Sequence, residues 1–394
     1  MEFNPFLPEV RENPYPYYTY LRQHDPVHQV KNMGYWVITR YDDVFSALRS
    51  PQVFSSSIFM MALMGELSPF LADVPLMIGS DPPNHTRLRK LVNRAFTPRR
   101  IASLEVHLRE MVHSLLDQAV AEGEFDLTRD LAIPVPVMAI AELLGVPPER
   151  YRDFRHWTAC VIQGTNGGNA MSPEMRAEIR QSTDALHAYF QAAIAGYRQQ
   201  PGDNLISDLV RAEEENQVLT ADEVLNMALL VMFGGSETTT NLIGNMTLAL
   251  LDNPEQLAAV RANPALIPQV VEEAVRYDAP VQGLFRQTTQ DVELSDTKIP
   301  AGSVVQVMFG SASRDERKFA DPDRFDVLRN SDGHVSFGFG IHFCLGAQLA
   351  RLEAKVALEG LLQRFSRISH TDAQITRVES IALRGPKSLP LMVS

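Results

Sequence analysis

One cysteine near the C-terminal end of the chain stands in a setting suited to metal binding. Cys344 follows two glycines, Gly338 and Gly340, and precedes a third, Gly346. Apolar residues at positions 345, 349, 352 and 356 predict a helix that starts at this loop. A helix start offers unpaired N–H groups and a positive dipole end, and both favour a thiolate. The sequence therefore predicts a metal ligand, whereas the alternative is a buried free cysteine acting as a small apolar side chain.

The glycines favour the ligand interpretation because they let the backbone approach a large flat group. His342 adds a donor for an acidic group on that ligand. The run from Phe337 to Gly346 reads Phe-Gly-x-Gly-x-His-x-Cys-x-Gly and resembles the cysteine-ligand loop of the cytochrome P450 family. The resemblance implies that Cys344 holds the iron of haem b and that Phe337, His342 and Gly346 lie in the cofactor site. A thiolate ligand favours O–O cleavage, so oxygen activation is the expected chemistry.

A long helix is predicted before this loop. Thr220 and Glu223 form a capping box at its start, and Asp252-Asn253-Pro254 ends it. Its middle carries two glycines, Gly234 and Gly235, which cost about 1 kcal/mol each relative to alanine. A flat cofactor close to the backbone would offset that cost, whereas the alternative is a helix distorted around a structural glutamate.

The glycines are followed by Ser-Glu-Thr-Thr-Thr, and the whole segment resembles the P450 stretch that delivers protons during oxygen activation. By that resemblance Glu237 takes the acid position and Thr238 the alcohol position of a catalytic pair. We expect this pair to govern oxygen-dependent turnover.

The resemblance extends to three further motifs. Asp81-Pro-Pro-Asn-His85-Thr-Arg-Leu-Arg89 matches the family pattern in which the histidine and the second arginine bind haem propionates. Prolines ahead of a first helical turn are tolerated, and residues four apart share a helix face. Arg286 matches a third propionate-binding position. Glu273 and Arg276 match the Glu-x-x-Arg pair that supports the fold behind the haem, although the spacing alone would also suit a surface ion pair.

A pliable apolar surface is predicted between positions 54 and 80, where four methionines occur. The corresponding family segment covers the substrate pocket; an ordinary helix pair in the core is the alternative. The resemblance assigns mostly apolar residues to this pocket, namely Met77, Leu230, Phe233, Gly234, Gln282, Leu284 and Phe285. A hydrophobic substrate is therefore expected, such as a fatty acid, a terpenoid, a steroid-like compound or a polyketide.

Composition restricts the other possibilities. The 394 residues carry a formal net charge of −12, which argues against general nucleic-acid binding, and two cysteines exclude a disulfide framework. Cys160 has neither a glycine loop nor a helix start beside it. The N-terminus shows no signal peptide or membrane anchor, so a soluble cytoplasmic protein is expected.

The expected fold is the P450 fold, mainly α with small β-sheets (α+β). It would be a helical prism with a β-rich subdomain built from both termini, and residues 1–394 would form a single haem domain. Specific elements are a strand over 34–39, a helix over 41–49, helices from 101 to 199 with breaks at prolines and glycines, and a hairpin over 293–309.

The function implied by the resemblance is a haem-thiolate monooxygenase that hydroxylates or epoxidises a small molecule with O2. A peroxide-driven peroxygenase and a non-catalytic haem sensor or carrier remain as alternatives. No flavin or iron–sulfur module is visible, so electrons are expected from a ferredoxin and ferredoxin reductase, and the protein is expected to be a monomer. Positions 87–100 hold six basic residues and no acidic one; apart from Arg89, which is assigned to a propionate, they form the expected docking surface, namely Arg87, Lys90, Arg94, Arg99 and Arg100. A solvated helix face is the alternative.

Overall fold

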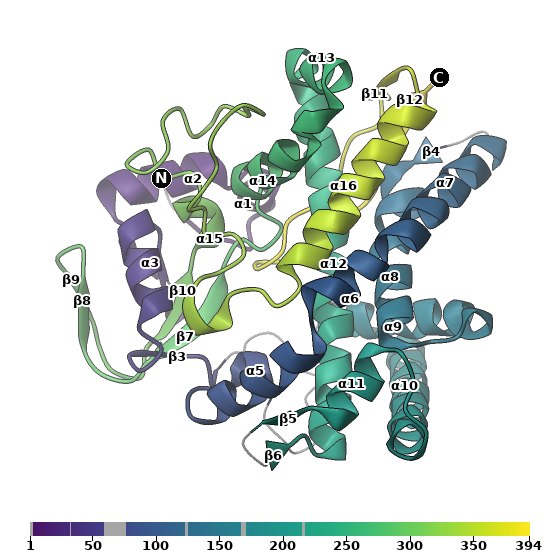
Figure 1. Cartoon of the computed structure of the whole chain (residues 1–394). Coiled ribbons are helices and arrows are strands. Elements are labelled where there is room, and N and C mark those ends of the chain that lie inside the picture. Colours follow the sequence, from purple (N-terminus) through teal and green to yellow (C-terminus); the bar gives the residue numbers. More distant parts are fainter. Residues whose placement is uncertain (1–2, 32, 59–75, 123–124, 167–170, 215–216) are drawn as a thin grey trace. The chain divides into compact units, whose positions relative to one another are not determined.

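The computed structural model describes residues 3–31, 33–58, 76–122, 125–166, 171–214 and 217–394. The chain forms two compact units. The first unit comprises residues 1–55, 105–135 and 238–394, and the second comprises 56–104 and 136–237. The long helix α12 (Ala221–Asp252) passes from the second unit to the first between Glu237 and Thr238 (Figure 1).

A five-stranded sheet organises one part of the first unit. Its order is β1 (Val27–Val30), β2 (Tyr35–Ile38), β10 (Val304–Val307), β7 (Leu284–Thr288) and β3 (Phe54–Ser55). β2 and β10 run parallel, and the other neighbours are antiparallel. Strands from both ends of the chain therefore meet in one sheet, as expected, and the strand predicted over 34–39 is confirmed.

The hairpin predicted over 293–309 is wrong in its pairing. β9 (Thr297–Ile299) pairs with β8 (Val292–Leu294), while β10 pairs with β2 and β7. The tight turn between β8 and β9 has positive φ at Ser295 and Asp296, the conformation of a primed hairpin turn. Residues 299–302, inside the predicted hairpin, instead lead the chain from this ribbon into the five-stranded sheet.

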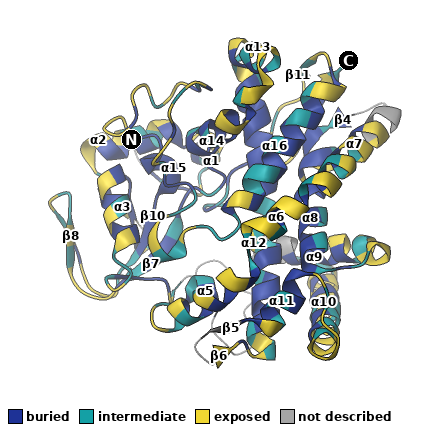
Figure 2. Ribbon diagram, in the orientation of Figure 1, coloured by how far each residue is buried: buried dark blue, intermediate teal, exposed yellow. Residues whose placement is uncertain are grey.

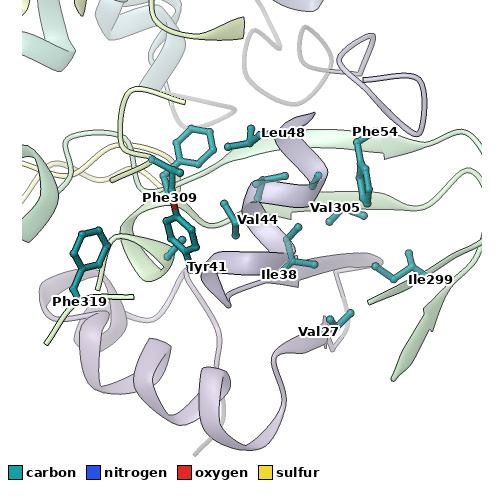
Figure 3. Close-up of a cluster of buried hydrophobic side chains, with 14 residues drawn as sticks. Val27, Ile38, Tyr41, Val44, Leu48, Phe54, Ile299, Val305, Phe309 and Phe319 are labelled. Carbon is teal, nitrogen blue, oxygen red and sulfur yellow. The ribbon is translucent and has the colours of Figure 1, made fainter. Parts of the chain in front are cut away.

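One face of the sheet packs against α3 (Tyr41–Arg49), the helix predicted over 41–49. Figure 3 shows Val44 and Leu48 of this helix beside sheet residues such as Val305. The same buried cluster contains Val335, at the start of the cysteine loop. This packing anchors the loop to the sheet, and burial of each large apolar side chain contributes about 1.5–3 kcal/mol.

Two helices of the first unit are connected through α16. This helix (Ala347–Arg364) packs against α7 (Glu105–Glu122) and α14 (Ile267–Tyr277). Gly360 permits the close approach to α7, because a Cβ there would overlap Val112. Other elements are α1 (Pro8–Glu12), α2 (Tyr15–His24), β4 (Phe125–Asp126), η3 (Thr128–Ala132), α13 (Pro254–Ala262), η6 (Pro264–Leu266), α15 (Phe309–Ala312), η7 (Gly340–His342), β11 (Ile368–His370) and β12 (Pro390–Val393). β12 lies between β11 and β4 in a small sheet.

The second unit is almost entirely helical. Its elements are η2 (Met77–Gly79), α5 (Asn84–Ala95), α6 (Pro98–Ser103), α8 (Pro134–Leu144, which starts in the first unit), η4 (Pro148–Arg150), α9 (Tyr151–Asn166), α10 (Pro173–Gln199), α11 (Leu205–Arg211), β5 (Glu213–Glu214) and β6 (Gln217–Val218). The break predicted at positions 145–148 is seen between α8 and η4, and Pro134 begins a helix, where a missing N–H is tolerated. The break predicted at Pro136 is wrong, because this residue lies within the first turn of α8, and α9 continues past Gly164 to Asn166. Positions 123–124 and 167–170 of the other predicted breaks lie outside the described residues.

Figure 2 contrasts the buried residues of α12 with the exposed outer residues of α10 (Figure 2). The predicted methionine-rich surface lies largely outside the described residues, which include Met77 of η2 but not positions 59–75. Within the described part of the chain, no helix combines the length and apolar character that a membrane crossing requires.

Candidate cofactor and active site

The backbone around Cys344 takes the conformation that its glycines predict. Gly338 and Gly340 have φ of 71° and 69°, in the left-handed region that favours glycine. A Cβ at Gly340 would lie 2.7 Å from the carbonyl oxygen of Leu48. The Cys344 N–H donates to the Phe337 oxygen at 2.9 Å, which closes the loop just before α16 begins. The thiol is thus placed at a helix start, as predicted.

The same loop leaves apolar side chains accessible. Phe339 and Phe343 are 39% and 41% exposed, and Phe337, Ile341 and Leu345 are partly exposed, as is Cys344 itself. A Cβ added at Gly346 would meet no heavy atom within 4 Å. A soft thiolate surrounded by accessible apolar groups suits a metal held in a large apolar ring.

Charged side chains next to Phe337 stabilise the position of the cysteine loop. Arg351 stacks on the Phe337 ring at 4.5 Å and donates to Glu272 at 2.9 Å. His334 also contacts Glu272, at 3.3 Å. Although burial alone would raise the pKa of Glu272, the hydrogen bonds from Arg351 and His334 hold it near 2. The Glu272 carboxylate therefore stays ionised at neutral pH and holds Arg351 against the Phe337 ring.

The predicted structural pair is buried. Glu273 and Arg276 are each 0% exposed and form two hydrogen bonds, of 2.7 and 2.8 Å. Arg276 also donates to the carbonyl oxygens of Ser313 and Pro322, and Glu273 accepts from Ser331 at 2.7 Å. A surface ion pair is excluded. Because these partners come from the segment before the cysteine loop, the pair holds that segment in place.

One short face of α12 is accessible. Between positions 224 and 250 every residue is buried except Leu230, Phe233, Gly234, Gly235, Glu237 and Thr238. Five of the six recur at the spacing of a single helix face. By contrast, the Ser236 hydroxyl donates a hydrogen bond to the backbone oxygen of Met232 in the same helix, and the Thr240 hydroxyl donates one to the backbone oxygen of Ala132. The acid and the alcohol predicted as a pair are the polar side chains on the accessible face.

The two glycines of α12 serve different purposes. A Cβ at Gly235 would lie 2.5 Å from Ile140 of α8, so this glycine permits close packing of two helices in the second unit. A Cβ at Gly234 would meet nothing within 4 Å. Helix packing therefore explains Gly235, whereas Gly234 leaves open backbone beside Phe233 and Glu237.

The second unit also carries His85 and Arg89 on α5. His85 is 1% exposed, and burial together with the Arg89 charge lowers its pKa to about 4. The imidazole is therefore neutral at pH 7. Met77 precedes this helix in η2 and is buried.

The first unit carries Arg286 on β7, where the side chain is 5% exposed and one guanidinium nitrogen donates to the Phe285 oxygen at 2.8 Å. The Phe285 ring packs edge-on against Tyr35, and Gln282 bonds to Tyr18 and to the Ala279 oxygen. These contacts leave Leu284 as the more accessible of the three pocket residues predicted here.

Comparisons with known proteins identify the family. The family model described as "Cytochrome P450" matches residues 169–391. Cytochrome P450 107B1 from Saccharopolyspora erythraea is 41% identical, with coverage of 93% of this chain and 91% of the relative. The chain belongs to the cytochrome P450 family.

Two further similarities extend this result. The vitamin D(3) 25-hydroxylase of Pseudonocardia autotrophica is 39% identical over 88% of this chain and 85% of that protein. The solved structure of cytochrome P450 CYP109Q5 from Chondromyces apiculatus superposes with a TM-score of 0.92 at 41% identity and covers 100% of this chain and 98% of that one. The predicted family and fold class are thereby confirmed.

As a member of the cytochrome P450 family, the protein is a monooxygenase that binds haem b through a cysteine thiolate. The residues present fit that group. The first unit offers a thiolate at a helix start, an accessible apolar loop and open space at Gly346, and each suits a flat iron macrocycle.

Sequence reasoning missed a buried acid on α16. Glu353 is 0% exposed, and burial raises its pKa to about 8, although the nearby Thr239 hydroxyl of α12 acts to lower it. The carboxyl group therefore keeps its proton at pH 7. The predicted apolar stripe included Leu352, which is only partly buried, whereas Glu353 occupies the core position. Spacing from Leu349 and Val356 could have revealed this, because residues four and three apart share a helix face.

Proposed function

We propose that this cytochrome P450 hydroxylates or epoxidises a hydrophobic small molecule with O2, using electrons from a ferredoxin and its reductase. The observation that carries the proposal is the cysteine loop: Cys344 ends a loop of left-handed glycines, precedes α16 and is surrounded by accessible apolar groups. In this proposal residues 1–394 act as one haem domain.

The chain's residues have separate roles. Cys344 ligates the iron, Phe337, His342 and Gly346 line the cofactor site, and Arg286 binds a propionate. Haem, when bound, supplies the chemistry that puts one oxygen atom of O2 into the substrate and the other into water.

Propionate binding in the second unit divides between two kinds of donor. The His85 ring provides an N–H group that donates a hydrogen bond. The Arg89 guanidinium, in contrast, provides a positive charge. Both donors lie on α5, four residues apart, which suits neighbouring carboxylates.

Forming water from O2 requires protons, and we assign their delivery to Glu237 and Thr238. Both side chains are partly accessible on α12, next to Gly234, where the backbone is open. The carboxylate exchanges protons with solvent, and the hydroxyl passes them on.

Thr238→Ala tests this assignment. The variant should keep its substrate affinity but form several-fold less product per electron consumed, because reducing equivalents then leave as peroxide. Thr239→Ala is the matched control, since the neighbouring hydroxyl is buried. The assignment fails if the ratio of product to electrons stays at the wild-type value in Thr238→Ala.

An apolar substrate of sterol-like size is the class we favour. Leu230, Phe233 and Gly234 form the accessible apolar part of α12, and Leu284 is accessible on β7. A vitamin D hydroxylase among the relatives supports the same class. A panel of sterols, macrolides, terpenoids and fatty acids should be screened for a shift of the haem absorbance; a response to charged compounds alone would contradict the proposal.

The proposed ferredoxin site uses the basic surface of α5 and α6. Arg94 and Arg99 are exposed, so we assign most of the interaction to these two arginines. Of the others, Arg87 pairs with Glu223, and Arg100 pairs with Asp203 and Asp208 at 2.7 Å.

Charge reversal tests this surface. Arg94→Glu with Arg99→Glu should slow the first electron transfer several-fold and weaken its salt dependence, because an acidic partner is steered by positive charge. Arg198→Glu with Arg367→Glu makes the same change in net charge at other exposed positions. Equal rates for the two double variants would place the docking surface elsewhere.

A further inference from the structure

Three potential metal-ligand side chains converge between two helices of the second unit. His156 and Cys160 lie four residues apart on α9, and Glu178 lies on α10. The Cys160 sulfur is 3.8 Å from the histidine Nε2 and 4.0 Å from the glutamate Oε1. The histidine and glutamate atoms are also 4.0 Å apart. The three donor atoms therefore form an almost regular triangle.

The size of this triangle matches a metal ion. A point at the centre of a triangle with 4 Å sides lies about 2.3 Å from each corner, close to Zn–S bonds of about 2.3 Å and Zn–N and Zn–O bonds of about 2.0–2.2 Å. A shift of a few tenths of an ångström in the exposed His156 and Glu178 side chains would complete the fit.

Burial gives the three donors unequal roles. The Cys160 residue is 6% exposed, whereas the side chains of His156 and Glu178 are 55% and 52% exposed. The sulfur is thus the buried donor of the cluster, and the imidazole and the carboxylate are its exposed donors. An ion entering from solvent would meet the two mobile donors first and would keep one coordination position open to water.

The chemical types of the three donor atoms determine which metal ion the cluster would bind. A thiolate excludes hard ions such as Mg²⁺ and Ca²⁺, which prefer oxygen ligands, while sulfur, nitrogen and oxygen together suit Zn²⁺. A thiolate and a carboxylate also neutralise the charge of one divalent ion. Binding displaces the thiol proton to the buffer and involves no oxidation or reduction.

We propose that His156, Cys160 and Glu178 bind one Zn²⁺ ion that joins α9 to α10. The site is separate from Cys344 and independent of the monooxygenase proposal. Because two ligands belong to one helix and the third to its neighbour, the ion restrains the packing of these helices. Zinc therefore stabilises the second unit and reduces the relative motion of α9 and α10.

Zinc titration of the haem-loaded protein tests this proposal, with free Zn²⁺ set by a competing chelator. We expect one ion per chain and a rise in melting temperature with zinc concentration. Cys160→Ala and Glu178→Gln should each weaken binding by at least about tenfold. Asp184→Asn, which removes an exposed acid from the same helix, should bind zinc like the wild type. Unchanged zinc affinity in both ligand variants would overturn the site.

Zinc X-ray absorption separates this site from binding elsewhere. The wild type should show one sulfur ligand, and Cys160→His should retain zinc with nitrogen in place of sulfur. If the wild type shows no sulfur ligand, or if Cys160→His still shows one, the assignment is wrong. The carbon monoxide spectrum of each variant reports haem ligation separately, so failure of the zinc site leaves the iron assignment standing.

Discussion

Cys344 and Cys160 differ in what holds each cysteine in place. Cys344 follows two glycines in the left-handed region, and its N–H closes a loop onto Phe337. Cys160 lies within the regular helix α9, where its place relative to His156 follows from helix pitch alone. The first setting requires an unusual backbone, whereas the second requires only that α9 and α10 pack together.

The surroundings of the two cysteines differ in the same way. Near the cysteine loop lie ion pairs whose members are buried or partly buried, Glu273–Arg276 and Glu272–Arg351. Around Cys160, the polar neighbours are exposed side chains. Substitutions near Cys344 should therefore damage the fold, while those near Cys160 should mainly remove donor atoms.

The largest expected effect comes from the buried pair. Arg276→Ala removes a buried partner of Glu273 and leaves Arg329, at 3.1 Å, beside that buried carboxylate, so it should lower the free energy of unfolding by about 3 kcal/mol. Arg198→Ala, at an exposed position, should change it by about 0.5 kcal/mol or less. Urea unfolding followed by circular dichroism measures both. Similar losses in the two variants would mean that the pair does not support the cysteine loop.

A pH-dependent effect is expected from Glu353. Its folded-state pKa of about 8 exceeds the ordinary value of 4.5, so the folded protein binds more protons between these values. The stability that this group contributes is present below pH 4.5 and is lost as pH rises towards 8. Relative to Glu353→Gln, the wild type should lose about 1.4 kcal/mol per pH unit across that window. Exposed Glu255→Gln is the control; parallel pH curves for wild type and Glu353→Gln would refute this.

Backbone conformation should distinguish the cysteine loop directly. Gly340→Ala places a Cβ 2.7 Å from the Leu48 oxygen at a positive φ, and should cost about 1–3 kcal/mol. In Gly302→Ala the new Cβ is also at a residue with positive φ, but it meets no heavy atom within 4 Å. This variant therefore measures the cost of the backbone conformation without the cost of steric overlap. Melting temperatures should therefore fall further for Gly340→Ala. An equal fall would show that the loop does not press against Leu48.

The smallest effect is expected at the other cysteine. Without zinc, Cys160→Ala should change the free energy of unfolding by about 1 kcal/mol or less, because it removes one small atom from a regular helix pair. Urea unfolding in the presence of a chelator measures this. A loss as large as that of Arg276→Ala would abolish the distinction between the two regions.

Much of the cofactor region could be predicted because its signals are local. The glycine loop, the start of α5 and the capping box of α12 each lie within a short run of sequence. Their outcome depends on φ angles and on hydrogen bonds between near neighbours. The hydrogen bonds of 2.9 and 3.2 Å between Thr220 and Glu223 confirm the predicted box.

The errors arose where distant contacts decide. β10 pairs with β2, some 270 residues earlier in the chain. A local sequence pattern does not reveal such a distant partner, so it could not exclude the hairpin predicted over 293–309. The spacing from Leu349 and Val356 places Glu353 on a buried face of α16, but its neighbour Thr239 belongs to α12, which the sequence of α16 cannot identify. Likewise, Glu178 reaches Cys160 only through the packing of α9 on α10.

The most direct test of the account is the reduced carbon monoxide spectrum of four proteins, the wild type and three cysteine variants. Wild type and Cys160→Ala should show the absorbance of a thiolate-ligated haem, and Cys344→Ala should lose it. Cys344→His guards against simple loss of the cofactor, since it should retain haem with the absorbance of a nitrogen ligand. A thiolate-type spectrum in either Cys344 variant, or its loss in Cys160→Ala alone, would contradict the assignment of Cys344 as the iron ligand.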